Sequence, residues 1–178
     1  WMMLQHGLVF GSWFVFFITI EHFGERSLAI TNIVRNISSF LFLFVQAFAS
    51  VVSSLVGNLI GEDKSNSILY VCKKVIFLCY ITILPIIILF VLFPSYILRI
   101  YSDNAALVFE AIPTLKVMLT SYLIAVPTFV FFSVVSGIGH AVASLSIAFI
   151  SLFIYIMYVE AIGHFSSSVP LLWTSEHV

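Results

Sequence analysis

Charged residues are scarce in this chain: Asp, Glu, Lys and Arg together make up 8% of its 178 residues. Soluble domains carry about 25% charged residues, so the chain lacks the polar side chains needed to cover a water-facing surface. Hydrophobic residues account for 62%, and the formal net charge is −1. The composition therefore indicates an integral membrane protein in the lipid bilayer, with no electrostatic footprint for nucleic acid.

Cysteine is also rare, since Cys72 and Cys79 are the only two. On one helix they lie about 10 Å apart along its axis, which is too far for a disulfide. Enzyme motifs are missing too: there is no His-Glu-x-x-His, no Walker A motif, and Asp63 and Asp103 are isolated from one another. We therefore expect no enzyme, no catalytic residue, no metal site and no resident cofactor.

Uncharged windows long enough to cross a bilayer recur along the chain. A bilayer core about 30 Å thick needs about 20 apolar residues in a helix. The longest window, residues 117–159, is too long for one span and is split at Ser136-Gly137-Ile138-Gly139-His140. We expect an all-α fold with five complete membrane helices and the start of a sixth. Their expected ranges are about 2–20, 28–60, 69–93, 108–137 and 139–162, with the last helix starting at 171.

The two ends of the chain lie in apolar sequence. It opens at Trp1 and stops at Val178, in the first turns of the last expected helix, so we expect a piece of a longer protein. Orientation is harder to predict, because Lys and Arg are divided equally between the two sides. Only the local density of basic residues in the 61–74 loop favours the cytoplasm for that side.

Six polar or amphipathic side chains interrupt the apolar runs and are candidates to line a substrate cavity. They are Trp13, Arg35, Asn36, Gln46, Tyr122 and Thr128. Ionisable groups at membrane depth are functional candidates by default, but Arg35 has two open interpretations. It either contributes to a cavity or snorkels outward to pair with Glu21 or Glu25. The aromatic residues either face lipid or hold an organic cation.

A ridge of small residues runs along the second expected helix at every fourth position. Its members are Ala49, Ser53, Gly57 and Gly61. Small residues in register let two helix backbones approach closely in lipid. We therefore expect this helix to pack against another through Ser53 and Gly57.

Two prolines lie in the middle of expected spans. Pro85 and Pro127 remove the usual hydrogen-bond donors of the Ile81 and Leu123 carbonyls. Such breaks persist in membranes where neighbours or water satisfy the backbone again. Each proline is either a plain kink or a hinge beside a cavity.

Six short motifs occur in a fixed order along nearly the whole chain. They are Gly11-Ser12-Trp13-Phe14-Val15-Phe16-Phe17, Ile20-Glu21-His22-Phe23-Gly24, Leu28-Ala29-Ile30-Thr31-Asn32-Ile33-Val34-Arg35, Leu55-Val56-Gly57-Asn58-Leu59-Ile60-Gly61, Ser136-Gly137-Ile138-Gly139 and Trp173-Thr174-Ser175-Glu176. In this order and spacing they resemble the second half of multidrug and toxic compound extrusion (MATE) transporters. Trp173 by itself is typical of the aromatic belt at the membrane interface.

The resemblance implies a twelve-helix transporter with two six-helix lobes around a central cavity, of which residues 1–178 form the C-terminal lobe. It implies export of organic, often cationic, compounds by antiport with Na⁺ or H⁺ and alternating access. The implied location is the plasma membrane, the inner membrane of bacteria, with the 61–74 loop in the cytoplasm. The implied partners are the N-terminal lobe and small organic substrates.

The alternative is a flippase for lipid-linked oligosaccharides or polysaccharides, from the same superfamily. A cavity that binds pyrophosphate should contain several Arg or Lys side chains, and Arg35 alone argues against it. An uncharged substrate escapes that argument.

The acids that couple transport in some members of the family are missing from the matching helices here. The eight acids of this chain fall in loops, at helix starts or near span ends: Glu21, Glu25, Glu62, Asp63, Asp103, Glu110, Glu160 and Glu176. Lys116 is close enough in sequence to neutralise Glu110, and we expect water to solvate Glu176. A coupling carboxylate should lie near the membrane midplane, so we expect it outside this chain.

Overall fold

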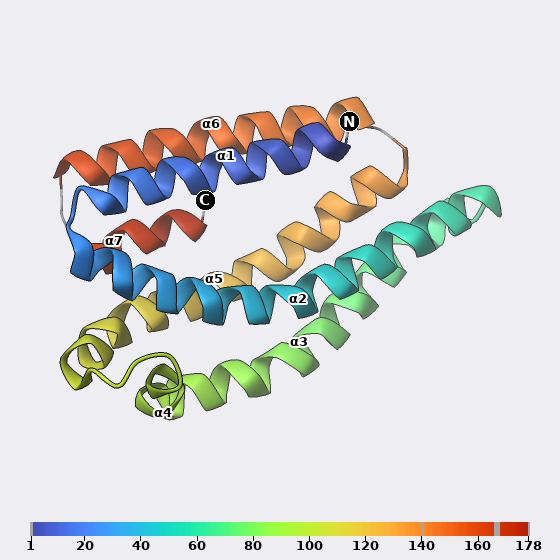
Figure 1. The fold of residues 1–178 in the computed structure, drawn as a ribbon. Coiled ribbons are helices and arrows are strands. Elements are labelled where there is room, and N and C mark those ends of the chain that lie inside the picture. The colour runs from blue at the N-terminus through green and yellow to red at the C-terminus, as the bar shows by residue number, and fades with distance from the viewer. Residues whose placement is uncertain (1, 140, 166–167, 178) are drawn as a thin grey trace.

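The computed structural model describes residues 2–139, 141–165 and 168–177; His140, at the expected split between two spans, lies outside them. No strand occurs in these ranges. The α-helices are α1 (Met2–Glu21), α2 (Glu25–Gly61), α3 (Ile68–Leu92), α4 (Pro94–Arg99), α5 (Ala105–Gly137), α6 (Ala141–Phe165) and α7 (Val169–Leu172) (Figure 1). Two 3₁₀ helices, η1 (Ser65–Ser67) and η2 (Trp173–His177), complete the described secondary structure.

Four of the helical segments are long and apolar enough to cross a membrane: Glu25–Gly61, Ser65–Leu92, Ala105–Gly137 and Val142–Phe165. A shorter apolar stretch, Gly11–Glu21, belongs to α1. Helices are the spanning structure that satisfies every backbone polar group within one segment of chain. The prediction of an all-α membrane fold is confirmed.

The connections between helices are shorter than the sequence indicates. Gly24 adopts a φ of 96°, a left-handed conformation that suits glycine, and α2 begins directly after it rather than at residue 28. After α2, helix α3 begins at Ile68. Lys73 and Lys74 therefore lie on the first turns of α3 and not in a loop.

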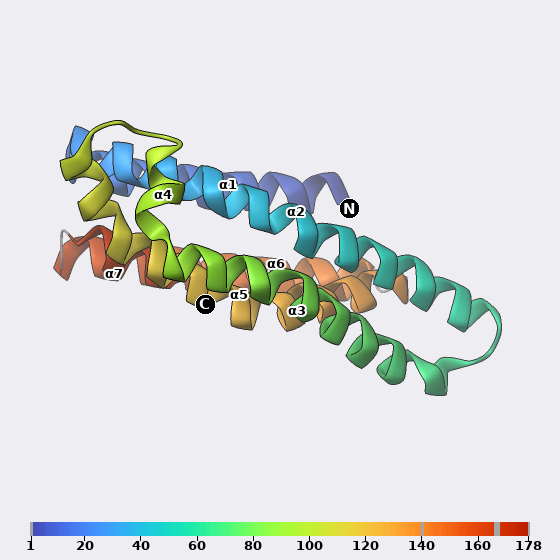
Figure 2. The same cartoon turned by 90° about the horizontal axis from the view of Figure 1, so that it is seen from below.

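The long helices form two groups. Helices α1 and α6 run side by side, whereas α2 packs along α5 and α3 covers both of them (Figures 1 and 2). After α6 the chain turns back, and α7 and η2 pack on α5 and on α6. The last described segment therefore lies between the two groups of helices (Figure 1).

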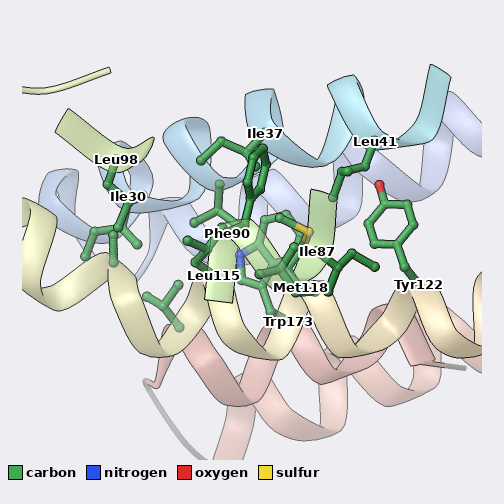
Figure 3. Close-up of a cluster of buried hydrophobic side chains, with 14 of the residues drawn as sticks. Ile30, Ile37, Leu41, Ile87, Phe90, Leu98, Leu115, Met118, Tyr122 and Trp173 are labelled. Atoms are coloured by element: carbon green, nitrogen blue, oxygen red, sulfur yellow. The ribbon is translucent and has the colours of Figure 1, made fainter. Parts of the chain in front are cut away.

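The main hydrophobic core joins these elements, and Trp173 is one of its largest members. Its side chain is 0% exposed and its ring meets that of Phe16 edge-on, with centroids 5.5 Å apart. Figure 3 shows the Trp173 ring among Leu115 and Met118 of α5. The expectation of an interfacial Trp173 is therefore wrong, because the chain folds back and places this residue against α5.

Small residues bring the backbones of α2 and α5 into close contact. A Cβ atom built on Gly137 would lie 2.6 Å from the backbone oxygen of Ser53, and one on Gly57 would lie 3.7 Å from the Gly137 oxygen. The predicted close packing through Ser53 and Gly57 is confirmed, with α5 as the partner. Gly61 lies beyond this contact, with no atom within 4 Å of a built Cβ.

The Leu123 carbonyl, which loses its backbone donor at Pro127, has a donor from another helix. The hydroxyl of Tyr80 on α3 donates a hydrogen bond to this carbonyl. The same face carries an open apolar pocket of about 560 Å³ between α3 and α5, lined in part by Tyr80, Pro85 and Leu123. The break in α5 is thus satisfied by a neighbouring side chain, as the membrane environment requires.

We expect Gly137→Ala to lower the free energy of unfolding of the protein by about 1–3 kcal/mol, the usual cost of overpacking. The added methyl group would press on the Ser53 backbone, which cannot turn away. Thermal unfolding in detergent measures the effect. The matched control is Gly57→Ala on the facing helix, where the contact distance is ordinary, and equal unfolding temperatures for the two variants would contradict the close approach.

We expect Tyr80→Phe to destabilise the protein by about 1–3 kcal/mol, because the Leu123 carbonyl would be left without a donor. The ring is retained, so packing changes little. The control is Tyr70→Phe on the same helix, where the Tyr70 ring is exposed and lies near the Lys74 ammonium. Equal thermal unfolding of both variants would show that the carbonyl finds another donor.

Candidate functional site

Arg35 of α2 places its guanidinium against two aromatic rings of α1. The guanidinium carbon lies 5.1 Å from the ring centroid of Trp13 and 4.8 Å from that of Phe17. Trp13 and Phe17 are four residues apart on a helix, so their side chains share one face. A cation within about 6 Å of an aromatic centroid is attracted by about 0.5–2 kcal/mol, and here two rings contribute.

No carboxylate pairs with Arg35 among the described residues. Among the described residues, the ion pair between an arginine and a carboxylate joins Arg26 Nε to Glu110 Oε2, at 2.7 Å. The expected pairing of Arg35 with Glu21 or Glu25 is therefore wrong, because the guanidinium lies against the aromatic faces of α1 and forms no ion pair with either acid. The partner of Glu110 is likewise Arg26, at the start of α2, and not Lys116.

The rings around Arg35 belong to a larger group that reaches η2. We call Trp13, Phe16, Phe17 and Trp173 the aromatic cluster. The ring centroids of Trp13 and Trp173 are 6.2 Å apart, and Trp13 and Phe16 meet edge-on at 5.7 Å. The cluster thus connects α2, through Arg35, with the last described segment of the chain.

Tyr122 of α5 is buried and bonded to the same helix that carries Arg35. Its hydroxyl donates to the Ser38 backbone oxygen at 2.6 Å and lies 2.9 Å from Ser38 Oγ. Figure 3 shows the hydroxyl pointing toward α2 near Leu41. Ser38 follows Arg35 by three positions, so the two lie on neighbouring turns of one helix face.

The other three predicted cavity residues lie elsewhere. Asn36 and Gln46 are exposed on α2. Thr128 is also exposed, and its hydroxyl donates to the Ile124 carbonyl at 2.9 Å within α5. The structure therefore groups Trp13 and Arg35, with Tyr122 bonded to the helix of Arg35, and leaves Asn36, Gln46 and Thr128 on the surface.

Sequence reasoning missed Phe17 as a partner of Arg35, although its spacing from Trp13 was a usable signal. It also missed a set of polar contacts made by η2. Tyr155 donates to a Glu176 carboxylate oxygen at 3.3 Å, and the Tyr158 and Thr174 hydroxyls are 2.9 Å apart. On the other side, Thr120 Oγ1 lies 3.0 Å from His177 Nε2.

These contacts place η2, which carries Glu176, beside the middle parts of α5 and α6. Thr120 is near the midpoint of α5 and Tyr155 is near the midpoint of α6. Tyr155 contacts Glu176 itself, and Thr120 contacts the next residue, His177. Glu176 is only partly exposed. Glu176 thus lies early in the last helical segment, as expected, but α7 and η2 pack that segment against α5 and α6.

A metal centre finds no support in the described residues. They contain no group of three or more His, Cys, Asp or Glu side chains that could hold a metal ion. Cys72 and Cys79 are free and buried, and both are among the buried residues of α3. The groups available for recognition are aromatic faces, hydroxyls, one guanidinium and one carboxylate.

A comparison with protein families matched the MatE family over residues 2–159. Comparisons with curated proteins and with solved structures gave no match. The family match covers α1 to α5 and most of α6, and so includes Trp13, Phe17, Arg35 and Tyr122.

Proposed function

Because the chain belongs to the MatE family of membrane transporters, we propose that it exports organic, often cationic, compounds by antiport with H⁺ or Na⁺. The observation that supports this substrate class is the environment of Arg35. Its guanidinium lies over Trp13 and Phe17 without a carboxylate partner among the described residues. The proposal concerns the complete transporter and not a catalytic activity.

The guanidinium of Arg35 is itself a planar, delocalised organic cation. It is weakly hydrated compared with an ammonium ion, so aromatic faces compete well with water for it. A flat organic cation has the same charge distribution and the same preference for an aromatic face. The surface of α1 that holds Arg35 therefore has the chemistry needed to hold such a substrate.

Alternating access supplies the link to an ion gradient. In this proposal residues 1–178 are the C-terminal lobe, the N-terminal lobe closes the other side of the cavity, and the connection after α2 lies in the cytoplasm. A ligand shifts a two-state equilibrium only by its difference in affinity for the two states. Substrate and coupling ion must therefore bind the inward-open and outward-open states with different affinities. The proposed location is the plasma membrane of a bacterium.

The flippase alternative has less support. Recognition of a diphosphate calls for several Arg or Lys side chains, and the part of the chain that the structure describes has one partly buried example, Arg35. The other Lys and Arg side chains are exposed. Arg35 is moreover engaged by Trp13 and Phe17, which leaves the export of organic cations as the proposed function.

We expect the complete transporter, reconstituted in proteoliposomes, to accumulate ethidium when an H⁺ or Na⁺ gradient is imposed. Accumulation should stop when an ionophore collapses that gradient, because no other energy source is involved. Ethidium fluorescence on a nucleic acid trapped in the lumen gives the rate. Accumulation that persists after the collapse would contradict antiport.

We expect Trp13→Leu to weaken ethidium binding about 5- to 30-fold, which corresponds to about 1–2 kcal/mol for one lost aromatic face. Fluorescence polarisation with the complete transporter in detergent measures this affinity. The matched control is Phe14→Leu, since Phe14 is the next residue of α1 and is 68% exposed. Equal loss of affinity in both variants would point to a general effect on α1 and not to the face that holds Arg35.

A further inference from the structure

Glu176 is the acid of the described residues that is only partly exposed, whereas the other seven acids are exposed. Of those seven, Glu62, Glu110 and Glu160 each have a basic or histidine neighbour in an ion pair, and the remaining four are exposed without one. Glu176 takes part in no ion pair among the described residues, and its hydrogen-bond partner is the hydroxyl of Tyr155. It is thus a carboxylate at the level of the middle of α5 and α6 without a compensating cation.

The neighbours of Glu176 come from three elements. On α6, Tyr155 donates to it, and Tyr158 is occupied by Thr174. On α5, the Tyr122 hydroxyl donates to the backbone oxygen of Ser38 on α2. On η2 itself, His177 is held by Thr120. None of these groups is a Lys or an Arg.

Glu176 also shares a face of η2 with Trp173. In a 3₁₀ helix the side chains of residues i and i+3 eclipse one another, and these two residues have that spacing within η2 (Trp173–His177). Trp173 is fully buried, and its indole N–H has no hydrogen-bond partner in the described structure. A change in the protonation of Glu176 therefore acts on a short helix whose preceding turn carries Trp173, a member of the aromatic cluster.

We propose that Glu176, held by Tyr155, is a proton-binding site of this lobe and that its occupation is transmitted to the aromatic cluster through Trp173. The ionised carboxylate accepts the Tyr155 hydrogen bond. Protonation forms an O–H bond on one carboxyl oxygen and gives a neutral group, and release returns that proton to water on the other side of the membrane. Intramembrane carboxylates of this kind form proton relays in transporters.

A proton fits this site better than a metal cation does. A metal ion is bound by several oxygen ligands, and the described residues contain no group of three or more His, Cys, Asp or Glu side chains that could hold one. The Tyr155 hydroxyl directs its hydrogen, and not its lone pairs, toward the carboxylate. A single proton requires only the carboxylate itself and a path to water.

The role of Glu176 in driving export depends on the proposed function, whereas its protonation does not. The first experiment therefore uses no substrate. The complete transporter in detergent is titrated from acid to alkaline pH while its intrinsic tryptophan fluorescence is recorded. We expect a reversible step in the wild type that is lost in Glu176→Gln, because Trp173 is one turn away on the same face.

The matched control is Glu160→Gln on α6, which removes an exposed carboxylate that lies 3.9 Å from His164. The fluorescence step should remain in this variant. Tyr155→Phe should move the step to higher pH, because the ionised carboxylate loses its donor. This second variant keeps the test decisive if Glu176→Gln does not fold. A step that is unchanged in both site variants, or that is missing from the wild type, would overturn the proposal.

The second experiment measures transport in proteoliposomes. Under an imposed pH gradient, Glu176→Gln should accumulate ethidium at least about tenfold more slowly than Glu160→Gln. Ethidium counterflow without a gradient should be similar in the two variants, which shows that folding and substrate binding are intact. If Glu176→Gln still accumulates ethidium at the control rate, or if only a Na⁺ gradient drives the wild type, the proton site is wrong. If no gradient drives the wild type while the fluorescence step depends on Glu176, antiport fails and the proton site stands.

Discussion

The close approach of α2 to α5 is the contact on which the rest of this structure depends. Gly137 lets the Ser53 backbone come within contact distance, and the bond from Tyr122 to Ser38 fastens the same two helices further along. Helix α2 presents Arg35 to α1, whereas α5 supports η2 through Thr120. Both the aromatic cluster and the Glu176 carboxylate are therefore positioned by the pair of α2 and α5. The glycines at their contact, Gly57 and Gly137, permit the close approach because they have no side chains.

The membrane fold was predictable because the bilayer restricts the chain to a small set of solutions. Long apolar windows must become helices, and the five windows did so near their expected ranges. The boundaries were less predictable: Gly24 makes the turn before α2 so tight that the helix starts at once. Trp173 shows a different limit. An indole is suited both to the membrane interface and to a core, and only the fold-back of α7 and η2 decides between them.

The candidate site was predictable in its residue types and not in its pairings. Arg35 is conspicuous in an apolar run. That it contacts aromatic rings and does not pair with Glu21 or Glu25 depends on how α1 packs against α2. The sequence places Glu176 at the start of the last helix, but it does not show that this helix start packs beside the middle of α6, where Tyr155 contacts the carboxylate. Pairings across helices require tertiary structure that no local pattern contains.

The bond from Tyr80 to the Leu123 carbonyl bears on how α5 can flex at Pro127. In an unbroken helix, bending strains a ladder of equivalent backbone bonds, and the resistance is spread over several residues. Here the free carbonyl is secured by a side chain of α3. Flexing of α5 at this point would therefore have to break one specific hydrogen bond to α3, next to the apolar pocket.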